Sequence, residues 1–182
     1  MPEHDLAALW EAHCRCEFET RDADATMATM VASPYVNHIP TMAGGVGHDQ
    51  LKRFYKYHFI GANPPDMTMI PVSRTIGTDR LVDEMIVRFT HTAAIDWMLP
   101  GIAPTGRTVE VPLVAIVQFR DGKVAHEHIY WDLASVLVQI GRLDPHGLPV
   151  AGAATARKVL DPALPSNSLL GEAWQSSEGK PI

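Results

Sequence analysis

The spacing of apolar residues changes once along the chain, near residue 67, and this change constrains the fold more than any other feature. Before it, apolar side chains recur every three to four residues, which is the period of an amphipathic helix. We predict helices over about 5–20, from 22–24 to near 31, and over about 49–60. After residue 67, apolar and polar residues alternate, which is the period of a β-strand.

The second half of the chain carries four strand patterns, which we place at 67–78, 81–92, 109–120 and 123–132. Asp121-Gly122 joins the last two and is a strong signal for a tight hairpin. A loop over 93–107, rich in Pro and Gly, separates the second strand from the third. Shorter features are an extended 35–40, a glycine loop over 44–47, a helix over 134–140 and one short helix near 152–159.

Helices that precede a run of strands are typical of the α+β class, with the helices packed on one face of the sheet. We therefore expect a curved antiparallel or mixed sheet wrapped around three N-terminal helices, forming a cone with an internal pocket. The cone domain is placed at 1–142. Residues 143–182 contain several prolines and are expected to form an extended C-terminal arm that packs on the domain or on a dimer partner.

The charge balance excludes several classes of function. Acidic residues outnumber basic ones by 21 to 15, which gives a formal net charge of −6, and no basic block is present. Nucleic acid and anionic membranes are therefore not expected as partners. The sequence has no signal-peptide pattern and no apolar run long enough to span a membrane. Its two cysteines, Cys14 and Cys16, are two residues apart in a predicted helix, so their side chains should point in different directions and are not expected to pair. We expect a cytoplasmic protein.

Histidine is unusually frequent, with nine residues against four tyrosines and five phenylalanines. It titrates near neutral pH and is the commonest metal ligand. Four histidines lie on helix flanks or loops and are interpreted as solvated or packing residues: His4, His13, His48 and His146. His58 is interpreted as a core residue, and four candidates are left to converge on one cavity: His38, His91, His126 and His128.

The last predicted strand gives the most specific geometry. Because alternate side chains of a strand share a face, one face should carry four polar groups: His126, His128, Tyr130 and Asp132. The other face should carry Ala125, Glu127, Ile129 and Trp131. The polar row either lines the pocket or faces solvent or a dimer contact, and Asp132 is either a pocket carboxylate or the N-cap of the helix that follows it.

Several short motifs agree with one known family: Thr-His-Thr at 90–92, Pro-Thr-Gly at 104–106, Asp-Gly-Lys at 121–123, Trp131-Asp132, and Gln-Ile-Gly at 139–141. Through them the chain resembles the SnoaL-like polyketide cyclase family, within the cone-shaped α+β superfamily similar to nuclear transport factor two. The resemblance implies catalysis without cofactor or metal, with Asp132 as the general base. It also implies that His91 lines the cavity, and the predicted catalytic residues are therefore Asp132 and His91.

Further residues are expected around such a base. A hydrogen-bond donor opposite Asp132 would stabilise the enolate that it creates, and the candidates are Tyr130, His91, His38 and Trp97. Asp83 and Glu84 are neighbours within a predicted strand, so one of them must face inward. We predict that Glu84 is the inward-facing residue. The predicted substrate-binding set is His38, Glu84, Trp97, His126, His128 and Tyr130.

Three functions stay open from the sequence. The first is a cofactor-free acid/base enzyme, such as a cyclase, isomerase, dehydratase or hydrolase, that acts on a small carbonyl compound. The second is a metal site in which His126 and His128 are completed by His38, His91 or Glu84. The third is a ligand-binding domain without chemistry. A small-molecule ligand and a homodimer are expected in each case.

Overall fold

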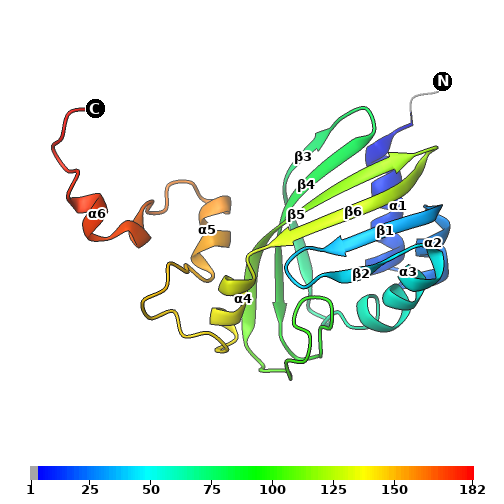
Figure 1. Ribbon diagram of the computed structural model, residues 1–182, viewed down its shortest axis with the longest axis horizontal. Helices are drawn as coiled ribbons and strands as arrows, with labels where there is room; N and C mark the ends of the chain where they lie inside the picture. The colour runs from blue at the N-terminus through cyan, green and yellow to red at the C-terminus, as the bar shows by residue number, and fades with distance from the viewer. Residues whose placement is uncertain (1–3) are drawn as a thin grey trace.

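The computed structural model describes residues 4–182 and shows a six-stranded sheet that curls over a layer of helices (Figure 1). The first half contributes α1 (Leu6–Phe18), α2 (Ala23–Ala28), β1 (Met30–His38), β2 (Ala43–Val46), α3 (His48–Phe54) and a π-helical turn η1 (Tyr55–Phe59). The second half contributes β3 (Thr68–Ile76), β4 (Arg80–Thr90), β5 (Thr108–Arg120), β6 (Lys123–Trp131), α4 (Leu133–Gln139), α5 (Ala154–Leu160), a 3₁₀ turn η2 (Ser168–Leu170) and α6 (Glu172–Gln175).

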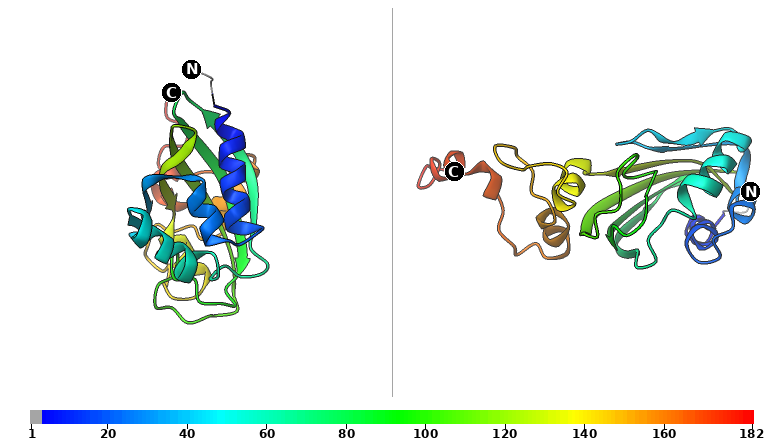
Figure 2. Two further views of the ribbon diagram at one scale, coloured as in Figure 1. Left: turned by 90° about the vertical axis from the view of Figure 1, so that its right-hand side faces the viewer. Right: turned by 90° about the horizontal axis from the view of Figure 1, so that it is seen from below.

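The strands lie in the order β2-β1-β6-β5-β4-β3, and β1 runs parallel to β6 while all other neighbours are antiparallel. The sheet is therefore mixed, and helices α1 to α3 lie together on one side of it (Figure 2). The predicted α+β class is confirmed. Within residues 4–182, no helix combines the length and apolarity that crossing a membrane requires.

Two predictions near the first strand are wrong. A helix was expected to reach residue 31, but β1 begins at Met30 and contains Pro34, next to the point where the register with β6 shifts. A proline is tolerated in a strand at such an irregularity because no ladder hydrogen bond is needed from it there. The expected glycine loop is strand β2, in which a Cβ on Gly44 would lie 2.0 Å from the carbonyl oxygen of Val36. Glycine is used here because the two strands approach too closely for a side chain.

The core lies between the concave face of the sheet and the helices. Along β5 the buried residues alternate with half-buried ones, as expected for a strand with one face in the core. Helix α1 begins at Asp5, whose side chain accepts a hydrogen bond from the Ala8 amide at 3.0 Å. Its Trp10 indole donates to buried Asp83 at 3.0 Å, and Arg74 also donates to that carboxylate, so polar contacts as well as apolar packing hold α1 on β4.

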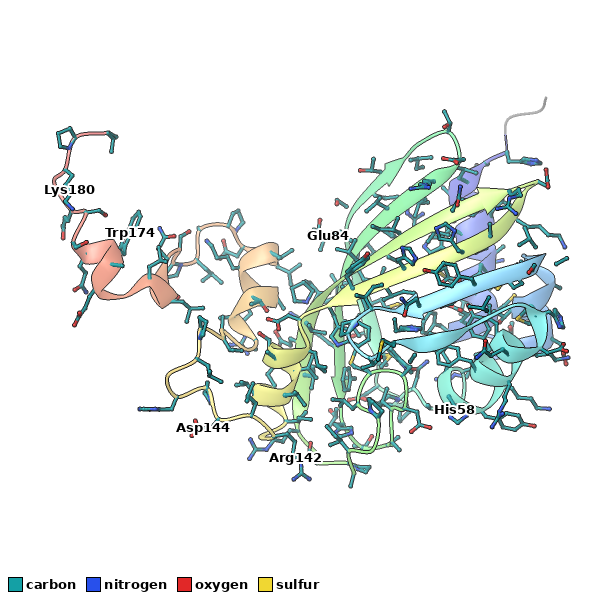
Figure 3. All side chains as sticks on the ribbon, viewed as in Figure 1. His58, Glu84, Arg142, Asp144, Trp174 and Lys180 are labelled. Carbon is teal, nitrogen blue, oxygen red and sulfur yellow. The ribbon has the colours of Figure 1, made fainter. Side chains whose placement is uncertain are left out.

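The C-terminal segment begins on the sheet and then leaves it. Helix α5 packs on β5 through the buried Ala156, and the Gly152 amide donates to the Ser135 hydroxyl of α4 at 3.2 Å. Every residue from 161 to 182 is exposed. This part, which includes α6, projects away from the sheet, and Trp174 and Lys180 lie far from the cone (Figure 3).

Candidate functional site

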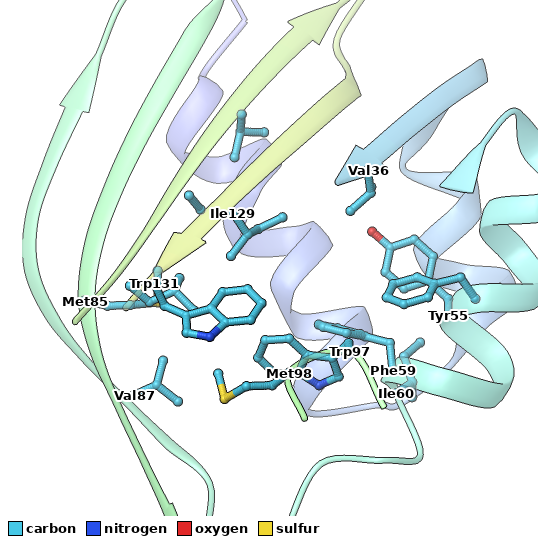
Figure 4. Packing of buried hydrophobic residues seen from close by; sticks show 14 of the residues in the cluster. Val36, Tyr55, Phe59, Ile60, Met85, Val87, Trp97, Met98, Ile129 and Trp131 are labelled. Atoms are coloured by element: carbon cyan, nitrogen blue, oxygen red, sulfur yellow. The ribbon is translucent and has the colours of Figure 1, made fainter. Parts of the chain in front are cut away.

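A cavity of about 60 Å³ lies inside the cone between α1, η1 and the concave face of the sheet. Its walls are mainly aromatic side chains and methionines, and Figure 4 shows Tyr55, Phe59 and Trp97 packed together beside it. Two carboxylates reach this apolar lining, Glu17 from α1 and Glu127 from β6. The volume is well below the 300–1,000 Å³ of a typical ligand pocket, so a bound molecule must be small or must displace side chains.

The cavity contains two of the predicted binding residues. Trp97 lines it, and its indole donates to the Asn63 side chain at 2.9 Å. His38 also lines it, with its Nδ1 hydrogen-bonded to the Ala43 carbonyl at 3.1 Å, so Nδ1 carries the proton and donates. Burial lowers the pKa of His38 to about 4, which keeps the ring neutral at physiological pH and leaves Nε2 as a hydrogen-bond acceptor. Whether these two residues bind a substrate stays a prediction.

The polar row predicted on β6 does not line the cavity. Glu127, Ile129 and Trp131 point into the cone, so His126 and His128 lie half-buried, and Tyr130 lies exposed, on the outer face. The alternation of the strand was predicted correctly, but its direction was wrong. The large apolar side chains of Ile129 and Trp131 belong to the core, and strand geometry therefore turns the histidines outward.

Asp132 and His91 also have structural positions outside the cavity lining. Exposed Asp132 is the N-cap of α4, and its carboxylate accepts hydrogen bonds from the Ser135 amide, at 3.0 Å, and from the Ser135 hydroxyl. His91 is fully buried, and its Nδ1 is hydrogen-bonded to the Thr105 hydroxyl at 3.1 Å while its carbonyl accepts from the Thr105 and Gly106 amides. Burial, and then Arg142, lower the pKa of His91. These contacts attach the 91–107 loop to the end of β4.

Glu84 is the outward member of the Asp83-Glu84 pair, contrary to prediction. Its carboxylate accepts a hydrogen bond from Ser73 of β3 at 2.8 Å, whereas Asp83 faces inward and binds Arg74.

The three residues proposed to complete a metal site with His126 and His128 lie in other parts of the structure. His38 lines the cavity, His91 lies in the loop after β4, and Glu84 is paired with Ser73.

The polar group that does reach the cavity is a buried cluster of four side chains, which we call the inner cluster: His13 and Glu17 of α1, Tyr55 of η1 and Glu127 of β6. The Nε2 atom of His13 lies 3.1 Å from Glu17 Oε1 and 3.2 Å from Glu127 Oε1. The Tyr55 hydroxyl donates to Glu127 Oε1 at 3.1 Å. Such a set of polar groups is stable inside a core only because its members satisfy one another.

Hydrogen bonding defines the protonation of His13. The Thr29 hydroxyl donates to the Thr26 carbonyl at 2.6 Å, so it can only accept from His13 Nδ1, which lies 2.6 Å away and must carry a proton. Burial alone would lower the pKa of His13, but the charges and hydrogen bonds of Glu17 and Glu127 raise it to about 10. The ring is therefore an imidazolium at neutral pH and donates from both nitrogens.

The carboxylates respond to the same environment. Burial raises the pKa of Glu17, and the positive charge of His13 opposes this effect only in part. Burial and the two carboxylates also raise the pKa of Tyr55, so the phenol stays protonated and remains a donor. Two carboxylates share a single cation here, and the inner cluster is therefore well suited to take up one further proton on Glu17.

The inner cluster also has donors placed closely enough to hold a metal ion. One ligand atom from each of His13, Glu17 and Glu127 lies within 4.8 Å of the other two. The same atoms are already joined at hydrogen-bond distances through the His13 and Tyr55 protons. Protons therefore satisfy these donors, and the arrangement favours proton transfer over metal binding.

A curved mixed sheet that encloses a cavity beneath three helices defines the cone-shaped α+β fold of proteins similar to nuclear transport factor two. The chain belongs to the SnoaL-like domain family, whose model matches residues 10–127. No curated protein matches the sequence.

Solved structures agree with this fold. TsrD from Streptomyces laurentii is 19% identical to this chain and superimposes on it with a TM-score of 0.58. The match covers 76% of this chain and 96% of the TsrD chain. A candidate SnoaL-like polyketide cyclase from Jannaschia sp. CCS1 is 22% identical over 79% of this chain and 97% of its own, with a TM-score of 0.57. An NTF2-like protein of unknown function from Burkholderia pseudomallei K96243 is 18% identical over 74% and 95%, with a TM-score of 0.55. At these identities the likeness concerns the fold alone.

The inner cluster was missed by sequence reasoning, although two signals pointed to it. His13 and Glu17 lie four residues apart on the apolar stripe of the first helix, where a polar residue must find a buried partner. Glu127 shares its strand face with Ile129 and Trp131, and that face belongs in the core. The participation of Tyr55 had no comparable signal, because it depends on how η1 packs against β6.

Proposed function

We propose that the protein is a cofactor-free acid/base enzyme that moves a proton on a small apolar carbonyl compound bound in the cone. The observation that carries this proposal is the pair of carboxylates, Glu17 and Glu127, on the wall of an otherwise apolar cavity, bridged by the protonated His13. A carboxylate whose pKa is raised towards neutrality is an effective general base and, once protonated, an effective general acid. We assign this role to Glu17.

The neighbouring groups suit the charge changes of such a reaction. Removing a proton next to a carbonyl leaves negative charge on the carbonyl oxygen, and a hydrogen-bond donor at that oxygen lowers the barrier. Tyr55 lines the cavity and keeps its proton, so its hydroxyl supplies that donor once it turns from Glu127 Oε1 to the carbonyl oxygen. The imidazolium of His13 holds Glu17 and Glu127 in place and offsets their charge.

Access to the cavity needs side-chain movement. Met67, Met69 and Met85 form part of its lining, and Met69 is 38% exposed. Methionine has three rotatable bonds and adapts to irregular shapes, so these side chains can move to enlarge the cavity when a ligand enters. The substrate is accordingly expected to be apolar and compact, with its carbonyl end towards the inner cluster.

The proposal is tested by exchange of the α-protons of 2-tetralone, an apolar ketone, in deuterated water, followed by NMR. The wild-type protein should accelerate the exchange, and Glu17→Gln should lower the acceleration by about 100-fold or more. Glu84→Gln is the matched control, because this carboxylate lies on the outer face of the same sheet. Asp132→Asn should also keep the activity, and its loss in that variant would return the role of base to Asp132.

A second candidate function is ligand binding without chemistry. It is favoured by the hydrogen bonds that every member of the inner cluster already makes within the protein. Binding of 2-tetralone can be measured by isothermal titration calorimetry. Binding without any exchange in the wild-type protein would favour this function over the enzyme.

We further propose that the protein is a homodimer formed through the outer face of the sheet. That face carries the half-buried Val114 and Ile116 and the exposed Tyr130, and Leu169, Leu170 and Trp174 are exposed on the C-terminal segment. Light scattering after size exclusion measures the mass directly. A chain ending at residue 160 shows whether the exposed segment contributes to the dimer.

A further inference from the structure

A second hollow, which we call the outer hollow, lies between α1 and β3. It has a volume of about 330 Å³ and is lined by Glu11, Cys14, Arg15, Phe18, Glu19 and Met69. Three of these residues, Cys14, Phe18 and Met69, also line the cavity inside the cone. The cavity and the outer hollow are therefore neighbours that share a wall of side chains.

The shared wall comes from one helix face and one strand position. Cys14 and Phe18 are four residues apart on α1 and lie on the same face of that helix. Met69 pairs in register with Val87, which lines the cavity, so both side chains point to the inner side of the sheet. Met69 is also 38% exposed, and its flexible side chain can move to join the two spaces.

Strand β3 is tied to α1 by a polar contact at the other end of the outer hollow. Arg74 donates to Glu11 Oε1 at 2.9 Å and also holds Asp83 of β4. Met69 is near the start of β3, and Phe18 is the last residue of α1. We therefore expect the two spaces to open into each other at the end marked by Phe18 and Met69.

The joined space has the size of an ordinary ligand site. The cavity alone measures about 60 Å³, and the outer hollow of about 330 Å³ brings the joined space into the 300–1,000 Å³ range of such sites. Its inner end is apolar and reaches the carboxylates of the inner cluster, whereas its outer end is charged. A ligand that fills both parts must be elongated, with an apolar body.

Charged side chains of both signs surround the outer hollow. Glu11 is bound by Arg74, and Arg15 Nε lies 3.8 Å from Glu19 Oε2, which is longer than a hydrogen bond. The Arg15 guanidinium therefore keeps N–H donors to offer to a ligand. Because Glu11 and Glu19 flank Arg15 along the helix, they repel an anion, and a neutral oxygen is the better partner for Arg15.

We propose that the cavity and the outer hollow form one ligand site, opened by movement of Phe18 and Met69, for an elongated carbonyl compound with a hydroxyl group at its far end. The carbonyl lies at the inner cluster, and the hydroxyl oxygen accepts a hydrogen bond from Arg15. The inference rests on the proposed function, because it names the class of substrate for the same site. It is compatible with the proposed dimer, because the outer hollow lies between α1 and the inner side of β3.

Calorimetric titration with 2-tetralone and 6-hydroxy-2-tetralone tests the far end of the site. The wild-type protein should bind the hydroxyl compound about tenfold more tightly, the gain expected from one hydrogen bond to a charged group. Arg15→Met should remove this preference without changing the affinity for 2-tetralone. Arg53→Met, which replaces an exposed arginine of α3, is the matched control and should keep the preference. Tighter binding of 6-carboxy-2-tetralone than of the hydroxyl compound would overturn the assignment of a neutral far end.

Thiol labelling tests the shared wall without any ligand. In a Cys16→Ser background, the rate at which N-ethylmaleimide modifies Cys14 is followed by mass spectrometry. Met69→Ala should raise this rate by about tenfold, because it uncovers the thiol. Val72→Ala, which changes an exposed residue of the same strand outside both spaces, should leave the rate unchanged. Circular dichroism confirms that the variants are folded.

Failure of this inference differs from failure of the proposed function. Proton exchange of 2-tetralone together with an unchanged hydroxyl preference in Arg15→Met would overturn the inference alone, as would equal labelling rates in the two β3 variants. A hydroxyl preference that depends on Arg15, without any exchange, would support the inference and refute the enzyme. Absence of binding of either ketone to the wild-type protein would overturn both.

Discussion

The two faces of strand β6 place their polar groups in different environments. On the inner face, Glu127 is 4% exposed and is held by Tyr55 and His13 from two other elements. On the outer face, His126 and His128 are half-buried and contact Tyr35. The group that is more costly to bury lies inside because α1 and η1 supply its partners. Whether a residue on a strand is buried therefore depends on the partners available to it as well as on its polarity.

The largest expected effect comes from removing the cation of the inner cluster. His13→Ala leaves Glu17 and Glu127 buried beside each other without the charge that offsets theirs, which should lower the free energy of unfolding by about 3–5 kcal/mol. Urea denaturation followed by circular dichroism measures the change. The matched control is His48→Ala, an exposed histidine, which should stay within about 0.5 kcal/mol of wild type.

The second prediction is that the inner cluster makes the free energy of unfolding depend on pH. Folding raises the pKa of His13 from 6.5 to about 10, so its contribution is complete below pH 6.5 and is lost as the pH rises towards 10. The raised pKa of Glu17 acts in the same direction. The free energy of unfolding should therefore fall between pH 6.5 and 10, by an amount on the order of 2–4 kcal/mol. His13→Ala should give a flatter profile in urea titrations, and an equally steep one would contradict the assignment.

A smaller effect is expected at the end of β6. Asp132→Ala removes the N-cap of α4 and should cost about 1 kcal/mol, the usual contribution of such a cap. Asp5→Ala removes the equivalent cap of α1 and should cost a similar amount. Thermal unfolding of both variants makes the comparison. A far larger loss in Asp132→Ala alone would show that this carboxylate does more than cap a helix.

The smallest effect is expected on the outer face itself. His126→Ala should change the free energy of unfolding by about 0.5 kcal/mol or less, because the ring is half-buried and holds no buried charge. Burial, then His128, Arg80 and Arg120, lower the pKa of His126, so the neutral ring has no ion pair to lose at pH 7.5. Urea denaturation of His126→Ala and the wild-type protein measures the difference. A loss comparable to that of His13→Ala would remove the distinction between the two faces.

The fold could be predicted because its signals are local. The change from helical to strand periodicity, the Asp121-Gly122 hairpin and the apolar alternation of β5 each depend on neighbouring residues only. The β1–β2 region could not be predicted in the same way. Whether Gly44 marks a loop or a strand depends on how closely Val36 approaches it, and that distance is a tertiary property.

The site was harder to predict than the fold for a related reason. The alternation along β6 divides its residues into two sets, but the sequence of one strand does not say which set faces the core. The apolar bulk of Ile129 and Trp131 decides this, and it outweighs the preference of Glu127 for water once His13 and Tyr55 are present. His38 and Trp97 do line the cavity: His38 is the last residue of β1, Trp97 lies in the long loop after β4, and their ring centroids are 5.0 Å apart.

The parallel pairing of β1 with β6 has a consequence for biosynthesis. Tyr35 and His126 are neighbours in the sheet although they are far apart in the chain, so the wall of the cone closes only after β6 has left the ribosome. Until then β1 and β2 form a hairpin whose other edge is open, and the methionine-rich interior is uncovered. A nascent chain stalled before residue 123 should therefore be a better chaperone substrate than one stalled after the C-terminal segment has emerged.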